Sequence, residues 1–263
     1  LDFAPKAEGL YEEGGAGYVD PRKLVAAQKV SAFLHGGVML YEEVRAIEGA
    51  GPFKLRTHTG KTIEANRVVL SMDGYTNFLL QPSLGRSLEF VIKQHSVLLA
   101  ELDADEQQRL ANCPSLIWRL QGHPMLKSFY STPPVKYPDG KVCFKIGGSP
   151  FTPPTMSTPQ AFLDWFHSPG HADEIAALRE VLLTVLPGLR VKSWASKPCV
   201  NTYTAHEYPY VDRVAAGIYV CTGGCGSAAK SSDEIGYMGA LLAQHDEWRY
   251  DMPAHHFRAV YAN

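Results

Sequence analysis

The first part of the chain alternates between helical and strand-like patterns of apolar residues. Asp20 precedes Pro21, a pair typical of a helix start, and apolar residues follow at helical spacing from residue 24 to residue 30. Two glycines at positions 36 and 37 end this predicted helix. Residues 67–72 carry a continuous rather than alternating apolar run, which is typical of a buried parallel strand. These patterns predict an α/β unit.

The pattern changes near residue 82. Apolar segments around residues 97–99, 116–118, 129–130 and 142–146 are separated by turns rich in proline and glycine, and no helix is predicted between them. This arrangement predicts an antiparallel sheet inserted in the α/β domain. A hairpin turn is also predicted earlier in the chain, at Thr59-Gly60-Lys61.

Helical spacing returns in the last hundred residues. Thr158-Pro159 is predicted to cap one helix, and residues 171–186 form a second helix that ends at Pro187-Gly188. Residues 191–203 are predicted to be extended. A short buried strand at 217–221 and a final helix at 236–244 complete the prediction.

Composition excludes several classes of protein. With 263 residues, 45% hydrophobic and 20% charged, the chain has the composition of a packed globular protein with one large or two modest domains. There is no apolar run of roughly 18 residues and no signal-peptide core, so no membrane partner is expected. The net charge is −2 with both signs scattered, which argues against nucleic-acid binding.

The five cysteines are odd in number and widely spaced, which predicts a reducing compartment, the cytoplasm, rather than a disulfide framework. Neither Cys221 with Cys225 nor His255 with His256 has the ligand spacing of a zinc site, so no metal is expected. His95, His123 and His206 are predicted to be turn or surface residues, with a place near an active site as the alternative.

A glycine-rich turn follows the strand at 217–221. The sequence Gly223-Gly224-Cys225-Gly226-Ser227 leads from that strand into a helix, so backbone N–H groups and the positive end of the helix dipole are predicted to face a ligand. Residues 224–229 fit the form G-x-G-x-x-A, but too little chain follows for a full nucleotide-binding unit. Close packing of the helix on the strand remains the alternative.

Four segments carry a family resemblance. Residues 17–24 are similar to a Gly-x-x-x-Pro-x-x-Leu helix entry, and residues 68–80 to a Val-x-x-x-Gly-x-Trp-x-x-x-Leu-Leu strand and turn. Residues 197–204 match Cys-x-x-Thr-x-Thr, and residues 223–236 match Gly-x-x-Gly-x-x-x-Lys-x-Ser-x-x-x-Gly. The chain thereby resembles the flavoprotein amine oxidases of the D-amino-acid oxidase superfamily, in particular the branch of monomeric sarcosine oxidase and N-methyltryptophan oxidase.

The resemblance implies an α/β (α+β) fold that combines part of a Rossmann-like FAD-binding domain with an antiparallel-sheet substrate domain. Residues 1–81 are expected to be the C-terminal part of the FAD-binding domain, and residues 82–190 the substrate domain. Residues 191–263 are expected to return to the FAD-binding domain with the flavin-facing glycine turn.

The resemblance also implies the site. Cys199 matches the cysteine that holds the flavin through a thioether, although a free cysteine is more commonly a small buried apolar residue. Lys145 matches the lysine that helps oxygen accept electrons, and a cation inside an apolar strand costs desolvation. Lys230 matches the lysine that binds the substrate carboxylate, with an ordinary solvated lysine as the alternative. The implied cofactor contacts are Val44, Cys199, Gly223, Gly224, Cys225, Gly226, Ser227 and Lys230.

The implied reaction oxidises the CH–NH bond of a secondary amine or amino acid to an imine, with FAD as cofactor, oxygen as acceptor and hydrogen peroxide as product. Three departures concern the substrate side. Ser227 stands at the family's histidine, Ala229 at an aromatic residue and Asp73 at a glycine. Sarcosine itself is therefore not the expected substrate, and a bulkier amine is permitted.

The largest departure is an absence. The family's strand, Gly-x-Gly-x-x-Gly turn and helix, which hold the FAD pyrophosphate, have no counterpart before Asp20. The chain also begins with Leu1 rather than methionine. We therefore expect a break in a longer chain, with the missing part either supplied by a companion chain or fragment or lost by cleavage. The alternative is a flavin-free remnant that acts as a binding or assembly module, but the joint retention of Lys145, Cys199 and Lys230 favours the enzyme.

Overall fold

The computed structural model describes residues 7–262, which divide into two compact units. The first unit comprises the chain up to Tyr18 together with Lys93–Val200, and the second comprises Val19–Ile92 together with the chain from Asn201 onward. The chain crosses from one unit to the other after Ile92 and after Val200. The predicted domain boundaries, after residues 81 and 190, lie about ten residues before these two crossing points. The assignment of residues 1–81 and 191–263 to FAD binding and of residues 82–190 to substrate binding stays a prediction.

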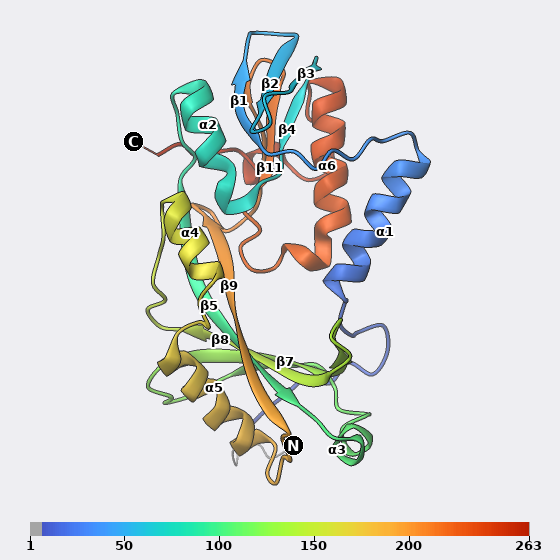
Figure 1. Cartoon of the computed structure of the whole chain (residues 1–263), viewed down its shortest axis with the longest axis vertical. Helices are drawn as coiled ribbons and strands as arrows, with labels where there is room; N and C mark the ends of the chain where they lie inside the picture. The colour runs from blue at the N-terminus through green and yellow to red at the C-terminus, as the bar shows by residue number, and fades with distance from the viewer. Residues whose placement is uncertain (1–6, 263) are drawn as a thin grey trace. The chain divides into compact units, whose positions relative to one another are not determined.

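The first unit is built on a five-stranded sheet with the order β6-β7-β8-β5-β9 (Figure 1). The β6–β7, β7–β8 and β5–β8 pairs are antiparallel, as the sequence predicted. Its elements are β5 (Phe90–Glu101), α3 (Ala104–Arg109), β6 (Leu116–Arg119), β7 (Leu126–Lys136), β8 (Val142–Pro150), α4 (Pro159–Phe166), α5 (Ala172–Val185) and β9 (Ser193–Thr204).

Helix α5 covers one face of this sheet. Its apolar residues, including Leu178 and Leu182, pack against Leu98 of β5 and Phe144 and Ile146 of β8, all of which are almost fully buried. The spacing of these residues along α5 is the helical spacing predicted from the sequence. This core holds strands β5 and β8 in place.

One prediction for this region was wrong. Helix α3 lies between β5 and β6, where no helix was expected. It is six residues long and mostly polar, so it has no apolar stripe to reveal it, and it begins where the Asp103 side chain accepts the Glu106 N–H at 2.8 Å.

The second unit contains two small sheets and helices on them. Its elements are α1 (Pro21–Leu34), β1 (Val44–Glu48), β2 (Phe53–Thr57), β3 (Thr62–Ala65), β4 (Val68–Leu70), the 3₁₀ turn η1 (Asp73–Tyr75), α2 (Thr76–Leu84), β10 (Tyr210–Ala215), β11 (Ile218–Thr222), η2 (Ala228–Ser231), α6 (Ser232–His245) and η3 (Ala254–His256). The β2–β3 hairpin turns at the predicted glycine, Gly60.

The sheet that bears on function has the order β10-β11-β4. Strand β11 pairs in parallel with β4, with Ile218 opposite Val68 and Val220 opposite Leu70, and in antiparallel fashion with β10. Helix α6 packs on this sheet through Met238 and Leu242, which meet Val211 and Tyr219. The mixed helices and sheets confirm the α/β (α+β) fold class.

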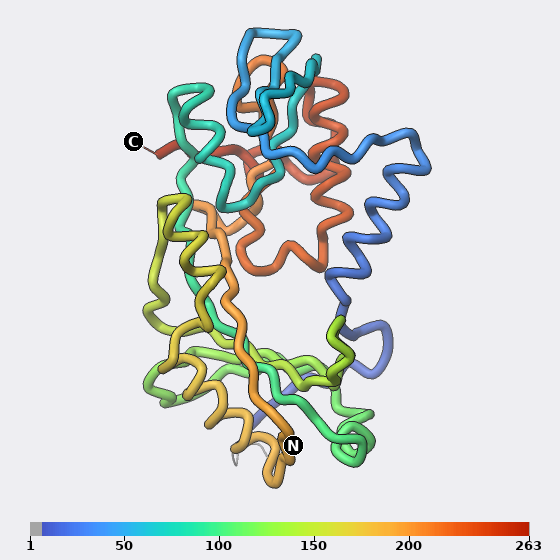
Figure 2. Tube along the Cα trace, viewed as in Figure 1, coloured from blue at the N-terminus to red at the C-terminus, as the bar shows by residue number. Residues whose placement is uncertain are grey.

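Helix α1 begins as predicted but does not bury its apolar residues. The Asp20 carboxylate accepts the N–H groups of Arg22 and Lys23 at the helix start. All residues of α1 are described and none is buried, and Phe33 and Leu34 are 70% and 73% exposed. The chain then runs to β1 without entering a sheet in the described structure (Figure 2). An apolar helix face therefore has no cover within the second unit.

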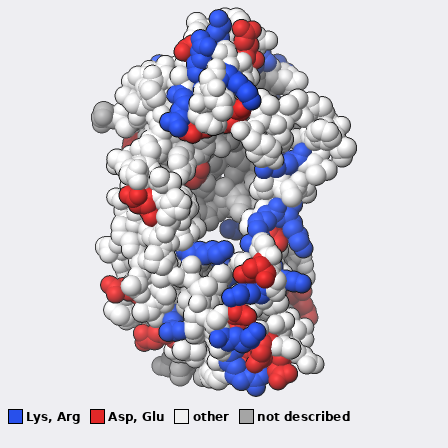
Figure 3. Space-filling model, viewed as in Figure 1, with Lys and Arg blue, Asp and Glu red and all other residues white. Residues whose placement is uncertain are grey.

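Surface charge and helix length agree with the composition. On the face shown in Figure 3, basic and acidic side chains are interspersed rather than gathered by sign. Among the described residues, no helix combines the length and apolar character needed to cross a bilayer. All five cysteines are free thiols.

Candidate functional site

Two parallel strands of the second unit end at the same sheet edge. Since β4 and β11 run in the same direction, Asp73 after β4 and Gly223 after β11 both lie at their carboxyl ends. The carboxyl ends of parallel strands are where ligands bind in open α/β sheets. The glycine turn predicted from the sequence therefore stands at the position where this fold binds ligands.

The turn depends on glycine at two positions. Gly223 has φ +78°, and a Cβ there would lie 2.5 Å from Cγ2 of Thr204. Gly226 has φ +72°, and a Cβ there would lie 3.2 Å from the Asn201 amide nitrogen. Both residues have a backbone conformation that larger residues rarely adopt, and at Gly223 a Cβ would also clash with Thr204.

Most backbone donors of the turn are used within the chain. The N–H of Gly224 donates to the Asp73 carboxylate at 3.2 Å, and that of Cys225 donates to the Thr202 carbonyl at 2.9 Å. The N–H groups of Ser227 and Ala228 both donate to the Gly224 carbonyl. The prediction of a row of free donors is therefore wrong for these four residues. Of the turn residues between 224 and 228, Gly226 is the one whose N–H has no partner among the described residues.

The start of the following helix also differs from the prediction. The turn leads first into the short 3₁₀ turn η2, and α6 begins only at Ser232, four residues before the predicted start at 236. The N-terminus of α6 thus lies beyond Lys230, not directly at the glycines.

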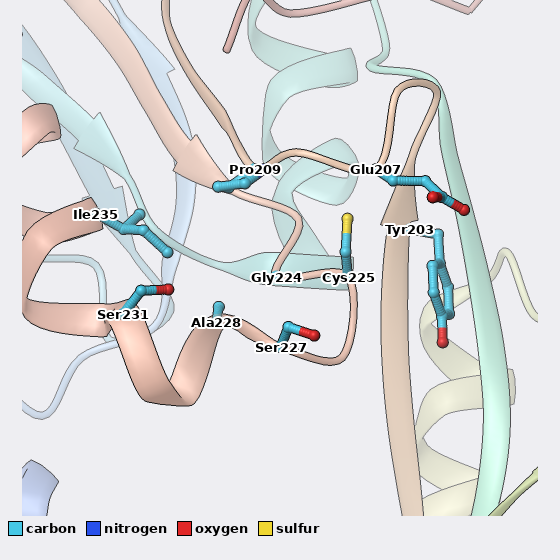
Figure 4. A pocket seen from close by; sticks show the side chains of 9 residues that line it. All are labelled: Tyr203, Glu207, Pro209, Gly224, Cys225, Ser227, Ala228, Ser231 and Ile235. Carbon is cyan, nitrogen blue, oxygen red and sulfur yellow. The ribbon is translucent and has the colours of Figure 1, made fainter. Parts of the chain in front are cut away.

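A cavity of about 260 Å³ adjoins the turn (Figure 4). The sulfur of Cys225 and the hydroxyls of Ser227 and Ser231 give it a polar lining on the turn side. Its wall is formed by Tyr203, Glu207, Pro209, Gly224, Cys225, Ser227, Ala228, Ser231 and Ile235. Cys225 has φ +49°, and its Sγ lies 3.3 Å from the Gly223 carbonyl and 3.5 Å from Thr204 Oγ1.

Two predicted cofactor contacts lie away from this cavity. Lys230 is exposed at the end of η2, and Val44 begins β1, where it packs partly buried against the core around Phe53 and Val68. Neither residue contributes to the cavity wall described above. The cavity therefore brings together Gly224, Cys225 and Ser227 of the predicted set.

The first unit holds the other two predicted residues. Lys145 lies in β8, half-buried, with Nζ 5.1 Å from the centre of the Tyr130 ring. Cys199 lies in β9, and β5 alone separates these strands in the sheet. Partial burial raises the pKa of the Cys199 thiol, while the positive charge of Lys145 acts to lower it. Lys145 and Cys199 therefore share one electrostatic environment.

A chain of contacts supports the backbone of Cys199. The Trp165 indole N–H, from α4, donates to the Cys199 carbonyl at 3.0 Å, and the Trp165 ring lies 4.5 Å from the ring of His171. The His171 N–H donates to Ser96 Oγ at 2.9 Å, and the Ser96 N–H donates to Glu174 at 2.8 Å. No sequence motif indicated this support.

Glu174 is the buried end of that chain. It is 3% exposed, and its Oε1 has no hydrogen-bond partner among the described residues. Burial raises the pKa of its carboxyl to about 7. Between about pH 4.5 and pH 7, the Glu174 carboxyl is therefore protonated in the folded protein and ionised in the unfolded chain.

Replacing Glu174 by glutamine should remove a pH dependence of stability. Because the pKa is higher in the folded state, the contribution of Glu174 is full below pH 4.5 and is lost as pH rises to about 7. We expect the free energy of unfolding of the wild type to fall by about 1–3 kcal/mol over this range relative to Glu174→Gln. Urea unfolding at several pH values measures it.

Glu106→Gln is the matched control for this experiment. The Arg109 guanidinium lowers the pKa of the buried Glu106 carboxyl, so the stabilisation from Glu106 is lost as pH falls. The difference in unfolding free energy between wild type and variant should therefore change with pH in opposite directions for the two variants. Equal slopes for the wild type and Glu174→Gln would contradict a protonated Glu174.

The candidate histidines take part in local hydrogen bonding or packing rather than in the cavity wall. His123 Nδ1 accepts the N–H groups of Met125 and Leu126, and the His206 ring bonds to the Arg258 carbonyl. These contacts fit the predicted turn positions. For His95 the prediction of a turn or surface position was wrong, because this residue is buried within β5. Within the described part of the chain, no group of three or more His, Cys, Asp or Glu residues is arranged to hold a metal ion.

Comparison with known families decides the class. Residues 2–242 match the family described as FAD dependent oxidoreductase. The chain belongs to this family. No curated protein matches its sequence.

Solved structures of the same fold agree with this family. NikD, an unusual amino acid oxidase essential for nikkomycin biosynthesis, superimposes with a TM-score of 0.71 at 19% identity over 92% of this chain and 60% of its own. A mutant of Amadoriase I from Aspergillus fumigatus gives 0.69 at 19% identity, over 93% and 55%. Glycine oxidase from Geobacillus kaustophilus gives 0.60 at 20% identity, over 87% and 55%. The chain thus spans little more than half the length of these structures.

The residues of this FAD dependent oxidoreductase fit one end of the cofactor. A cavity of about 260 Å³ is smaller than the roughly 300–1,000 Å³ of a whole small-molecule pocket, so it suits part of a flavin. The pyrophosphate of FAD needs a glycine-rich turn between a strand and a helix. The sequence up to α1 has no such turn. The described residues thus include a glycine turn with an adjoining cavity that part of a flavin would fit, and no turn of the kind that holds the pyrophosphate.

Proposed function

We propose that this FAD dependent oxidoreductase oxidises the CH–NH bond of a secondary amine or an amino acid to an imine, with oxygen as the electron acceptor and hydrogen peroxide as the product. The observation that carries the proposal is Lys145, a half-buried lysine in the middle of a strand, whose charge acts on Cys199. A partly buried cation costs desolvation, so its place within a strand favours a role in a reaction.

The family supplies the chemistry through its cofactor. When bound, FAD would supply the redox chemistry that removes a hydride equivalent from the carbon beside the substrate amine and delivers electrons to oxygen. Lys145 provides the positive charge that favours electron transfer to oxygen, and the Lys230 ammonium binds a substrate carboxylate. Cys199 Sγ holds the flavin covalently, in the manner of sarcosine oxidase-like enzymes.

Small side chains suggest the kind of substrate. Ser227 and Ala229 take the places of a histidine and an aromatic residue in the sarcosine oxidase branch, and both are exposed. The wider space favours an amine or amino acid bulkier than sarcosine. NikD, which is named as an amino acid oxidase, supports an amino acid as the substrate.

A companion segment is part of the proposal. We propose that a strand, a glycine-rich turn and a helix that are not among the described residues supply the pyrophosphate site. The seat we assign to it is the exposed apolar stretch of the second unit from Val25 to Tyr41, together with the open edge of β4. A parallel sheet is normally covered on both faces, so a strand added beside β4 and a helix on α1 complete the unit.

Adding FAD to the purified protein tests the function. We expect yellow protein, colour that stays with the chain after acid precipitation, and hydrogen peroxide on addition of N-methyl amino acids. Protein that stays colourless with FAD, both alone and together with a strand–turn–helix fragment of the family, would overturn the proposal.

A further inference from the structure

Asp73 occupies an unusual position at the carboxyl end of β4. It has φ +47°, one of four non-glycine residues of the described chain with a positive φ, and it stands where the family's motif has glycine. Aspartate tolerates this conformation better than most residues but gains nothing from it by itself. The side chain therefore needs a reason to be there.

The carboxylate of Asp73 bridges two other segments of the second unit. Oδ1 accepts the Gly224 N–H of the glycine turn at 3.2 Å, and Oδ2 accepts the Thr202 hydroxyl of β9 at 2.7 Å. Thr202 is 1% exposed, and its own carbonyl accepts the Cys225 N–H at 2.9 Å. Asp73 and Thr202 thus hold two consecutive N–H groups of the turn.

The backbone of Asp73 is held as firmly as its side chain. Its carbonyl accepts the hydroxyls of Thr76 at 2.8 Å and Thr222 at 3.2 Å, and these two hydroxyls lie 2.9 Å apart. Both threonines are buried. The turn after β4, the start of α2 and the end of β11 are therefore joined at one residue, so the carboxylate has a fixed direction.

We propose that Asp73 is a positioning residue that clamps the glycine turn in its bent form and takes up the Gly224 N–H, so that the cavity-lining Gly224 does not offer this donor to a ligand. A charged acceptor forms a stronger hydrogen bond with a backbone N–H than a neutral one does. The carboxylate thereby keeps Gly224 from turning its N–H toward the cavity. The clamp is a property of the chain itself, and its bearing on flavin rests on the proposed function.

The thiol of Cys225 provides a measure of the clamp. Its Sγ is half-buried and contacts the Gly223 carbonyl and the Thr204 hydroxyl, so it reacts with an alkylating reagent faster when the turn opens. Site-resolved mass spectrometry of N-ethylmaleimide labelling separates Cys225 from the other four thiols. No flavin is needed, so a failure of the proposed function leaves this measurement intact.

Two variants of Asp73 separate the carboxylate from the backbone conformation. Asp73→Gly fits the positive φ and removes both side-chain bonds, and should raise the labelling rate of Cys225 about ten-fold. Asp73→Asn tolerates the same φ and keeps an acceptor oxygen for one of the two donors, and should raise the rate about three-fold. Hydrogen exchange of the peptide 222–230 should rise in the same order.

Asp246→Gly is the matched control. Asp246 also has a positive φ, +57°, and its carboxylate also accepts two side-chain bonds, from Arg213 and Tyr219, both at 2.8 Å. It lies at the end of α6 and makes no bond to the turn. Its replacement should destabilise the unit while leaving native-state labelling of Cys225 within two-fold of the wild type.

The outcomes decide the proposal in either direction. A rise confined to the Asp73 variants and to Cys225 supports the clamp. Equal Cys225 rates in Asp73→Gly and the wild type would overturn it, as would equal rises in Asp73→Gly and Asp246→Gly, which would mean general loosening.

Discussion

Replacing Lys145 by methionine should slow the reoxidation of the reduced flavin by oxygen about 100-fold or more. Removing one group that stabilises developing charge in a partly buried site costs about 10²–10³ in rate. Methionine keeps most of the length of the lysine stem, so contact with the Tyr130 ring is retained while the charge is lost. Stopped-flow absorbance of the reduced, FAD-loaded protein mixed with oxygen measures the effect.

Lys127→Met supplies the comparison for that experiment. Lys127 is also a lysine of the same sheet with its Nζ over an aromatic ring, 5.5 Å from the centre of Phe151, and it is exposed. Its replacement should leave the reoxidation rate unchanged. If both variants slow the reaction equally, or neither does, Lys145 has no special part in oxygen reduction.

Replacing Cys199 by alanine should abolish covalent attachment of the flavin while leaving the fold in place. Cys199 is half-buried in β9. Trp165 bonds to its backbone carbonyl, which alanine keeps, and Lys145 acts on its thiol only through charge. Removal of the sulfur therefore disturbs little packing. Intact mass spectrometry after denaturation should show the added mass of one flavin in the wild type and none in the variant.

Cys221→Ala tests whether the loss is specific. Cys221 is also a half-buried thiol with a pKa raised by burial, and its Sγ donates to the Ile235 carbonyl at 3.4 Å. This variant should keep the adduct. An adduct that survives in Cys199→Ala would move the attachment to another residue.

Local patterns predicted most elements because their causes are local. The cap at Asp20 and the cap at Thr158 place two helix starts at the predicted residues. The periodic apolar residues of α5 likewise follow from what the helix buries. Such elements need no knowledge of the rest of the chain. Strand β4 is parallel as predicted, but it is buried only at Val68 and Leu70, and Val69 between them is 42% exposed, so the prediction of a fully buried strand was wrong.

The elements that were not predicted depend on context. Helix α2 contains Pro82 and follows a turn that resembles a strand end, and β10 has charged residues within it. Helix α3 is an exception, because the Asp103-x-x-Glu106 spacing is typical of a helix start and indicates this helix from the sequence. The exposure of the apolar face of α1 was not predicted either, because periodicity shows that a face is apolar and not what covers it.

The candidate site shows the same division. Glycine in the turn predicts positive φ at Gly223 and Gly226, and the structure has it there. Positive φ at Asp73 could not be predicted, because its carboxylate is held by hydrogen bonds to segments about 130–150 residues away in the chain. Positive φ at Cys225 accompanies contacts with Thr202 and Thr204, which the local sequence does not reveal. The support of Cys199 by Trp165 is of the same kind.

The uncovered apolar side chains of α1 have a practical consequence for handling the protein. Exposed patches of this kind favour association between copies, and an unpaired strand edge such as that of β4 adds to the tendency. Self-association therefore competes with whatever else reaches α1, and it grows with protein concentration and with salts that strengthen apolar contacts. Flavin titrations over a dilution series distinguish two cases. A chain that cannot bind FAD stays without FAD at every protein concentration, whereas a chain whose α1 surface is covered by other copies of itself binds FAD better on dilution.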